Sequence, residues 1–244
     1  MHSRLKIPLL TLLLALFASG ACHAAFGKLA LTGNVSLYGG LSGLNSDWNF
    51  TSSDPVTGAG KALDLTRPYQ FGIEADFNRM QRRTNLWPVN PSIGVYLSNV
   101  NENNFKTVAT ASDQFHTTKR DAKLSLVEID LGVKSYFDED AEWVVPFVGG
   151  GLALVSADYS FKTVGTTKKL NTGTGLYDTI ATTSAKDADS GLLYGLWGSA
   201  GAVYTIKKRF NLGAEGRYLY TLNSIGSANS VSSWNLGLFA GLHF

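Results

Sequence analysis

The sequence predicts an all-β protein: a closed eight-stranded antiparallel up-and-down transmembrane β-barrel that occupies residues 25–244. Three observations lead to this fold class. Apolar residues recur with a two-residue period in eight separate segments, and this is the period of a β-strand. The opposite face of these segments carries glycine, polar and charged residues. Long and short connections alternate between the segments, as they do in barrels that cross a membrane.

The N-terminal residues 1–24 have the pattern of a secretory signal peptide. Arg4 and Lys6 precede the apolar stretch "IPLLTLLLALFA", and "CHA" stands before the expected cleavage site at Ala25. Cys22 is the only cysteine and lies in the part expected to be removed, so the mature chain would contain neither a disulfide nor a thiol ligand. Lipidation of Cys22 is a less favoured alternative, because Ser19 stands where a lipoprotein signal has an aliphatic residue.

The mature chain of about 220 residues is long enough for one sizeable domain. Removal of Arg4 and Lys6 from the 21 basic residues leaves 19, which balance the 19 acidic residues. A neutral chain argues against nucleic acid as a partner. The abundance of glycine and aromatic residues, together with few prolines, is typical of an all-β protein with many turns.

The first four strands are expected at residues 28–41, 69–77, 91–99 and 127–137. The fourth shows the pattern most clearly, since Val127, Ile129 and Leu131 alternate with charged residues. The remaining four strands are expected at 143–155, 191–206, 210–221 and 232–244. Segment 143–155 is apolar on both faces, and the favoured register turns Val144 and Leu152 outward and Phe147 inward.

Connection lengths predict the orientation of the barrel. Segments 42–67, 100–123, 156–190 and 222–231 are expected to be long or moderate polar loops, whereas 138–142 and 207–209 are short turns. Part of the loop 156–190, "DYSFKTV" at residues 158–164, could instead extend the strand before it. Outer-membrane barrels place short turns in the periplasm and long loops outside. Both termini are therefore expected in the periplasm, in a chain located in the bacterial outer membrane.

The charged face would line the inside of the barrel. Eight strands enclose a bore just wide enough for side chains, and burial of unpaired charges would cost several kcal/mol each. We therefore expect a luminal charge network that fills the bore with salt bridges. Its members are Glu74, Asp76, Glu128, Asp130, Lys134, Glu215 and Arg217.

Aromatic residues gather near the ends of the predicted strands and indicate two interfacial girdles. One girdle is expected beside the short turns and the other beside the long loops. The members of the second are Tyr38, Tyr69, Tyr194, Tyr220 and Trp234.

The last strand carries a further signal. Phe244 ends the sequence, and Leu242, Ala240 and Leu238 precede it at two-residue intervals. This ending resembles the assembly signal of bacterial outer-membrane barrels, and "PFVGGGLAL" and "LGAEGRYLYT" resemble strands of the small OmpA-like and opacity-type barrel family. The resemblance implies periplasmic chaperones, insertion by the barrel-assembly machinery, and contact with outer-membrane lipid and lipopolysaccharide. The peptidoglycan-binding domain of longer family members is expected to be absent.

These features predict a monomeric, non-enzymatic outer-membrane protein with a structural, adhesive or narrow-channel role. No catalytic residue, cofactor-binding residue, cofactor or metal ligand is predicted. Two alternatives are weaker. A lipid A-modifying enzyme would need a histidine and a serine together at the outer rim, and Ser112 with His116 is the only nearby pair. An OmpW-type path for small hydrophobic molecules would need a dry lumen near that rim, lined by Phe147 and Trp197.

Two basic segments could touch anionic groups, although solvated residues are the more favoured interpretation for both. "RMQRR", at residues 79–83, lies in a predicted periplasmic turn near lipid headgroups. Lys119, Arg120 and Lys123 lie at the foot of the predicted second outer loop, where lipopolysaccharide phosphates are expected.

Overall fold

The computed structural model describes residues 33–45, 49–50, 63–77, 89–137, 144–206, 209–225 and 231–243. The predicted signal peptide, the basic segment at 79–83 and the final Phe244 lie outside this part of the chain. Within it there is no helix long and apolar enough to cross a membrane.

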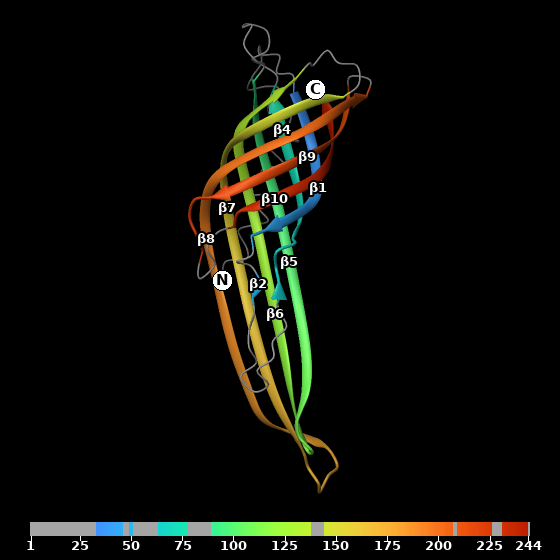
Figure 1. The fold of residues 1–244 in the computed structure, drawn as a ribbon, viewed down its shortest axis with the longest axis vertical. Coiled ribbons are helices and arrows are strands. Elements are labelled where there is room, and N and C mark those ends of the chain that lie inside the picture. The colour runs from blue at the N-terminus through green and yellow to red at the C-terminus, as the bar shows by residue number, and fades with distance from the viewer. Residues whose placement is uncertain are drawn as a thin grey trace, which may run out of the picture.

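Eight strands close into an antiparallel barrel, which confirms the predicted fold class (Figure 1). The order around the ring is β1-β10-β9-β8-β7-β6-β5-β4, so neighbours in sequence are neighbours in space, and β1 closes the ring between β4 and β10. The short strands β2 and β3 form a separate two-stranded sheet. The bounds are β1 Gly33–Leu44, β2 Asn49–Phe50, β3 Leu63–Asp64, β4 Tyr69–Phe77, β5 Val89–Ala111, β6 Gln114–Tyr136, β7 Val145–Leu170, β8 Tyr177–Ile206, β9 Phe210–Thr221 and β10 Ser233–His243.

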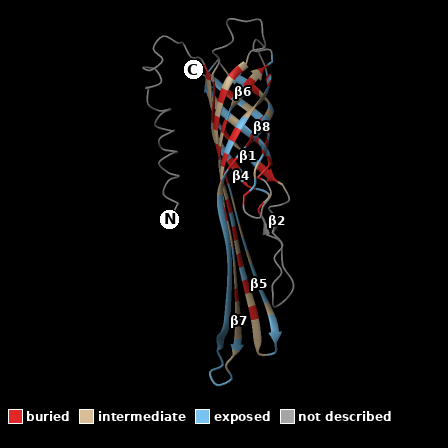
Figure 2. Cartoon of the chain, turned by 90° about the vertical axis from the view of Figure 1, so that its left-hand side faces the viewer, coloured by how far each residue is buried: buried red, intermediate tan, exposed pale blue. Residues whose placement is uncertain are grey.

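Four consecutive strands are about twice as long as the rest. β5, β6, β7 and β8 contain 23, 23, 26 and 30 residues, whereas the other barrel strands contain 9 to 12. Past the barrel rim they continue as one four-stranded sheet that projects far beyond β1, β4, β9 and β10 (Figures 1 and 2). We call this projection the distal sheet. It comprises residues 101–111, 114–123, 160–170 and 177–188.

The distal sheet corrects two predicted loops. Segments 100–123 and 156–190 are not long irregular loops, because most of each segment pairs as strand. A turn at residues 112–113 and a connection at 171–176 link the strands, and Gly175 adopts a left-handed conformation with a φ of 69° in the second link. Both faces of these strands carry polar residues, so the apolar alternation that reveals a strand is missing. Threonine and valine nevertheless favour extended backbone.

An apolar belt surrounds the barrel on its outer surface. Residues 144–155 follow the favoured register, with Val144 and Leu152 exposed and Phe147 buried. Soluble monomers rarely expose a continuous apolar surface of this extent, so the belt indicates lipid surroundings. Its exposed members include Leu37, Leu41, Tyr69, Phe71, Leu97, Leu131, Val133, Val144, Val148, Leu152, Leu154, Leu192, Tyr194, Leu196, Tyr204, Phe210, Leu212, Tyr218, Tyr220, Trp234, Leu236, Leu238 and Leu242.

The prediction is wrong for one residue of the aromatic girdle beside the long loops. Tyr38 points into the barrel, where it is 4% exposed and packs edge-on against Tyr96 with ring centroids 5.6 Å apart. Residue 38 follows the polar set Asn34 and Ser36 at two-residue spacing, so the pleat turns its ring inward with them. The other four members of that girdle are exposed.

Candidate functional site

All seven residues of the luminal charge network are buried inside the barrel. They come from β4, β6 and β9, and each stands on the face opposite the apolar belt because successive side chains alternate between the two faces of a strand. The structure divides six of them into two groups of ion pairs. One group is centred on Lys134 and the other on Arg217.

Lys134 holds two carboxylates from opposite sides of the lumen. Its Nζ lies 2.5 Å from Glu74 Oε1 and 3.2 Å from Glu215 Oε2. Ser92 and Tyr96 donate hydrogen bonds of 2.9 and 2.8 Å to the two oxygens of Glu74. The carboxylate of Glu74 therefore has a charged partner and two neutral donors, which is the arrangement that a buried charge requires.

Arg217 holds the second pair of carboxylates. Its Nη2 donates to Glu128 Oε1 at 2.7 Å and also contacts Asp130 Oδ2. The guanidinium lies over the ring of Tyr96, 4.2 Å from the centroid, and 5.3 Å from that of Trp197. The aromatic faces add cation–π attraction to the ion pairs.

These ion pairs cross the bore of the barrel. β6, which carries Lys134 and Glu128, is separated from β9, which carries Glu215 and Arg217, by β7 and β8 on one side and by four strands on the other. A bond between β6 and β9 consequently runs through the lumen. Such crossing bonds narrow the space along the barrel axis.

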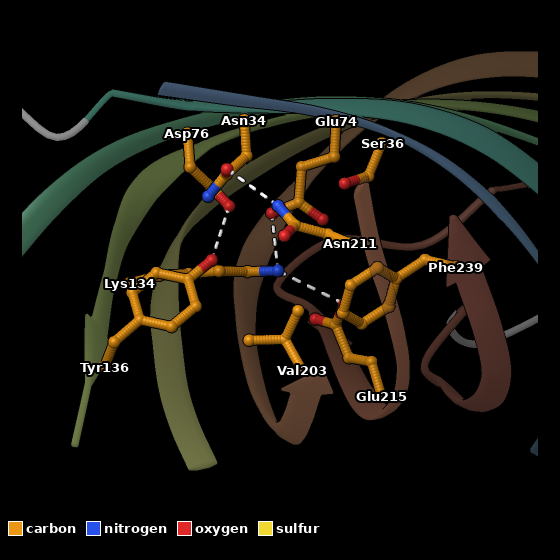
Figure 3. A pocket seen from close by; sticks show the side chains of 10 residues that line it. All are labelled: Asn34, Ser36, Glu74, Asp76, Lys134, Tyr136, Val203, Asn211, Glu215 and Phe239. Atoms are coloured by element: carbon orange, nitrogen blue, oxygen red, sulfur yellow. Dashed lines mark hydrogen bonds and ion pairs between the residues drawn. The ribbon is translucent and has the colours of Figure 1, made fainter. Parts of the chain in front are cut away.

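Asp76 is the seventh member of the network, and it takes part in none of the ion pairs given above for the described residues. Tyr136 donates a hydrogen bond of 2.7 Å to Asp76 Oδ2, and Asn211 donates one of 2.8 Å to Asn34 nearby (Figure 3). The cavity between these side chains and Lys134 has a volume of about 10 Å³. This is roughly the room that one water molecule needs, so the cavity is too small for a solute.

Apolar side chains pack in the lumen on both sides of the ion pairs, although at the end away from the distal sheet they lie beside the polar Asn34, Asp76 and Asn211. The cluster toward the distal sheet includes Leu124, Val155, Leu193 and Trp197, and it is joined by Leu65, Ile225 and Val231 from the connections. The cluster at the opposite end consists of Tyr136, Val145, Phe147 and Val203, packed against Phe239. The sequence pattern did not reveal the first cluster, because most of its members, among them Leu65, Leu124, Ile225 and Val231, lie outside the predicted strands.

The predicted pair of Phe147 and Trp197 does not line a common path. Trp197 belongs to the cluster near the distal sheet, whereas Phe147 belongs to the cluster at the other end of the barrel. Both rings point inward, but at different levels along the barrel axis. Trp197 pairs with Gly151, whereas Phe147, four residues earlier on the same strand as Gly151, pairs with Gly201.

The two residues of the proposed enzyme alternative lie in different surroundings. Ser112 is exposed in the turn between β5 and β6, whereas His116 is buried with its Nδ1 at 2.9 Å from Thr167 Oγ1. In the part of the chain that the structure describes, no group of three or more histidine, cysteine or carboxylate residues could hold a metal ion. The acidic turn at residues 138–142 lies outside that part.

Three residues of the predicted assembly signal lie on the outer face of β10. Leu238, Ala240 and Leu242 are exposed toward the apolar surroundings, and they pair with β1 and β9 at the seam where the ring closes.

The outer face of the distal sheet carries a basic surface that sequence reasoning found only in part. Lys119 and Lys123 lie on it, but Arg120 points to the opposite face and is 4% exposed. The strand register adds two lysines that are distant in sequence, Lys162 and Lys186. We call Lys119, Lys123, Lys162 and Lys186 the lysine patch.

Comparisons with known proteins concern the fold. No family model matches the chain, and no curated protein matches it. Among solved structures, Neisserial surface protein A (NspA) matches with a TM-score of 0.50 at 16% identity, over 87% of this chain and 97% of that one. OprG from Pseudomonas aeruginosa matches with a TM-score of 0.44 at 12% identity, over 88% and 97%. Ail of Yersinia pestis, in complex with the heparin analogue sucrose octasulfate, matches at 0.43 and 14% identity, over 88% and 99%.

The chain thus has the fold of a small eight-stranded outer-membrane β-barrel, as the sequence predicted.

Proposed function

We propose that this chain is a monomeric outer-membrane protein with a closed lumen, and that it acts through the surface it displays, in a structural or adhesive role. The distal sheet carries this proposal. Four strands continue without interruption from the barrel wall into a projecting sheet (Figure 2). A barrel that served only as a membrane plug would need no such extension.

The distal sheet is proposed to lie outside the cell and both chain ends in the periplasm. Asn34 at the start of β1 pairs with His243 at the end of β10, so both ends of the described barrel lie at the end opposite the distal sheet. The short links from β6 to β7 and from β8 to β9 lie at that same end. Short turns face the periplasm in outer-membrane barrels, which supports this orientation.

A narrow channel receives less support than a closed barrel. The ion pairs of Lys134 and Arg217 cross the bore, and an apolar cluster lies on either side of them. An ion on this path would have to break buried charge pairs and enter a dry region, both of which are costly. We propose that the luminal network stabilises the barrel and prevents leakage.

Insertion is proposed to use the barrel-assembly machinery and periplasmic chaperones, with β10 as the recognised strand. The outward side chains of Leu238, Ala240 and Leu242 support this proposal because they are available on the closing strand.

The displayed sheet can be tested by removing it. Replacement of residues 102–122 and of residues 161–187 by Asn-Gly joins directly paired positions, Asn101 with Lys123 and Ser160 with Ala188, through two-residue hairpins. We expect the shortened barrel to insert and to keep its heat-modifiable migration, while cells that express it lose attachment to epithelial layers and to one another. Unchanged attachment with normal surface levels would contradict the adhesive role.

A further inference from the structure

The lysine patch continues the outer, lipid-facing side of the barrel. Along this side the last row with apolar residues contains Leu97, Val127 and Leu192 together with Ser156, and the next row is polar, with Asn99, Ser125 and Asp158. Lys123 follows in the row after that, on the same face of the same strand. The lysines therefore point sideways, toward the molecules that surround the barrel.

The distance between the belt and the patch fits the anionic layer of the outer leaflet. Lys123 is four residues beyond Val127 along β6 and Lys119 is eight residues beyond it, which corresponds to about 13 and 27 Å of strand. Strands tilted by about 40° place these two residues about 10 and 20 Å above the belt. This is the region of the phosphorylated sugars of lipopolysaccharide.

The patch has an excess of positive charge that the protein does not neutralise. Lys162 stands directly opposite Lys186 on the neighbouring strand, and like charges in this position destabilise a sheet. Two acidic residues share this face: Asp121, which is opposite Lys162 and 3.4 Å from Lys119, and Asp158, in the polar row next to Lys123. Four exposed lysines against these two aspartates leave a formal charge of +2.

We infer that the lysine patch binds phosphate groups of lipopolysaccharide molecules in the same leaflet, and that these contacts hold the distal sheet upright beside them. The inference rests on the proposed orientation of the barrel. A surface that served a distant partner would lie at the tip of the sheet or in its upper loops. The patch instead lies on the side of the sheet near its base, and its side chains point the same way as those of the lipid-facing barrel wall.

The test compares two variants that lose the same charge in the same sheet. The patch variant is K123Q/K162Q/K186Q. The control variant is K106Q/K168Q/K169Q, whose lysines lie nearer the tip. Purified full-length barrels in detergent are titrated with fluorescent lipopolysaccharide, with the same lipopolysaccharide after chemical dephosphorylation, and with a soluble sulfated polysaccharide. Heat-modifiable migration and protease resistance verify the fold of each variant.

The inference predicts a loss of lipopolysaccharide affinity of about fivefold for each lysine removed from the patch, and little loss in the control. Dephosphorylated lipopolysaccharide should bind the wild type as weakly as intact lipopolysaccharide binds the patch variant. If the patch variant and the control variant bound intact lipopolysaccharide with equal affinity, the inference would be overturned. If the patch variant lost affinity only for the sulfated polysaccharide, the inference would be overturned as well. The patch would then bind a partner on another cell surface and not lipopolysaccharide in the same leaflet. A periplasmic distal sheet, detected by labelling in whole cells, would refute the proposed orientation separately.

Discussion

Arg217 is the residue on which the buried charges of β6 depend most. Its guanidinium is the cation that contacts both Glu128 and Asp130, and it is 3% exposed. Substitution by alanine would leave two buried carboxylates without a charged partner. We expect R217A to lower the free energy of unfolding by about 3–5 kcal/mol, measured by urea titration of the protein in lipid bilayers.

A compensated variant separates charge from packing. In R217M/E128Q/D130N the cation and both carboxylates are replaced by neutral groups of similar size. The expected stability lies well above that of R217A and near that of the wild type, since neutral replacement of buried ion pairs is often tolerated. If the triple variant were as unstable as R217A, lost packing against Tyr96 and Trp197 would be the main cause.

Two adjacent glycines of β7 provide a second comparison at the residue scale. A Cβ on Gly151 would collide with the backbone carbonyl of Leu131. A Cβ on Gly150 would lie 3.2 Å from its nearest neighbour, the carbonyl oxygen of Trp197. We expect G151A to reduce stability by about 1–3 kcal/mol and G150A to change it much less. Refolding yield into bilayers and the urea midpoint measure both effects, and equal effects would contradict the close approach at Gly151.

The sequence predicts residue faces better than residue partners. The two-residue period is local, so it places Glu128 and Asp130 on the inner face without knowledge of the neighbouring strands. The pairing of Arg217 with both of them depends on how β6 and β9 face each other after the ring closes. No spacing along the chain encodes that contact.

At the scale of elements, the strands inside the membrane were predictable, whereas most of their extensions were not. β4 and β9 have the predicted bounds because lipid on one side and a polar lumen on the other impose strict alternation. Water on both sides of the distal sheet removes that constraint, so its residues resemble loops in composition. Backbone pairing of β5 with β6 and of β7 with β8 holds the extensions together instead.

A proline in the distal sheet tests whether it is a true pairing element. Thr118 of β6 pairs with Lys106 on one side and Gly165 on the other. Proline removes the amide donor and disrupts the ladder. We expect T118P to make the distal sheet sensitive to protease in intact membranes, while heat-modifiable migration of the barrel persists.

Ser112→Pro in the turn serves as the control, because it changes a residue outside the ladder. If both variants kept the protease resistance of the wild type, regular pairing around residue 118 would be disproved.

At the scale of the whole molecule, the barrel combines a polar centre with apolar material at both ends of its lumen. Along the lumen, an apolar cluster is followed by the crossing ion pairs and then by a second apolar cluster. This order predicts that the barrel does not conduct ions. Purified protein in planar bilayers should give no conductance steps at moderate voltage. Reproducible steps that change with substitutions at Glu128 or Arg217 would instead assign a channel role to the luminal network.

The orientation of the whole molecule can be decided with two single cysteines, because Cys22 is the only natural cysteine and lies within the predicted signal peptide. Thr172→Cys places a thiol in the link at the tip of the distal sheet, and Arg209→Cys places one in the short link at the opposite end. A maleimide that cannot cross membranes should label residue 172 on intact cells, and residue 209 only after the outer membrane has been permeabilised. The reverse pattern would place the distal sheet in the periplasm. Labelling of the protein without either substitution would show that Cys22 persists in the mature chain.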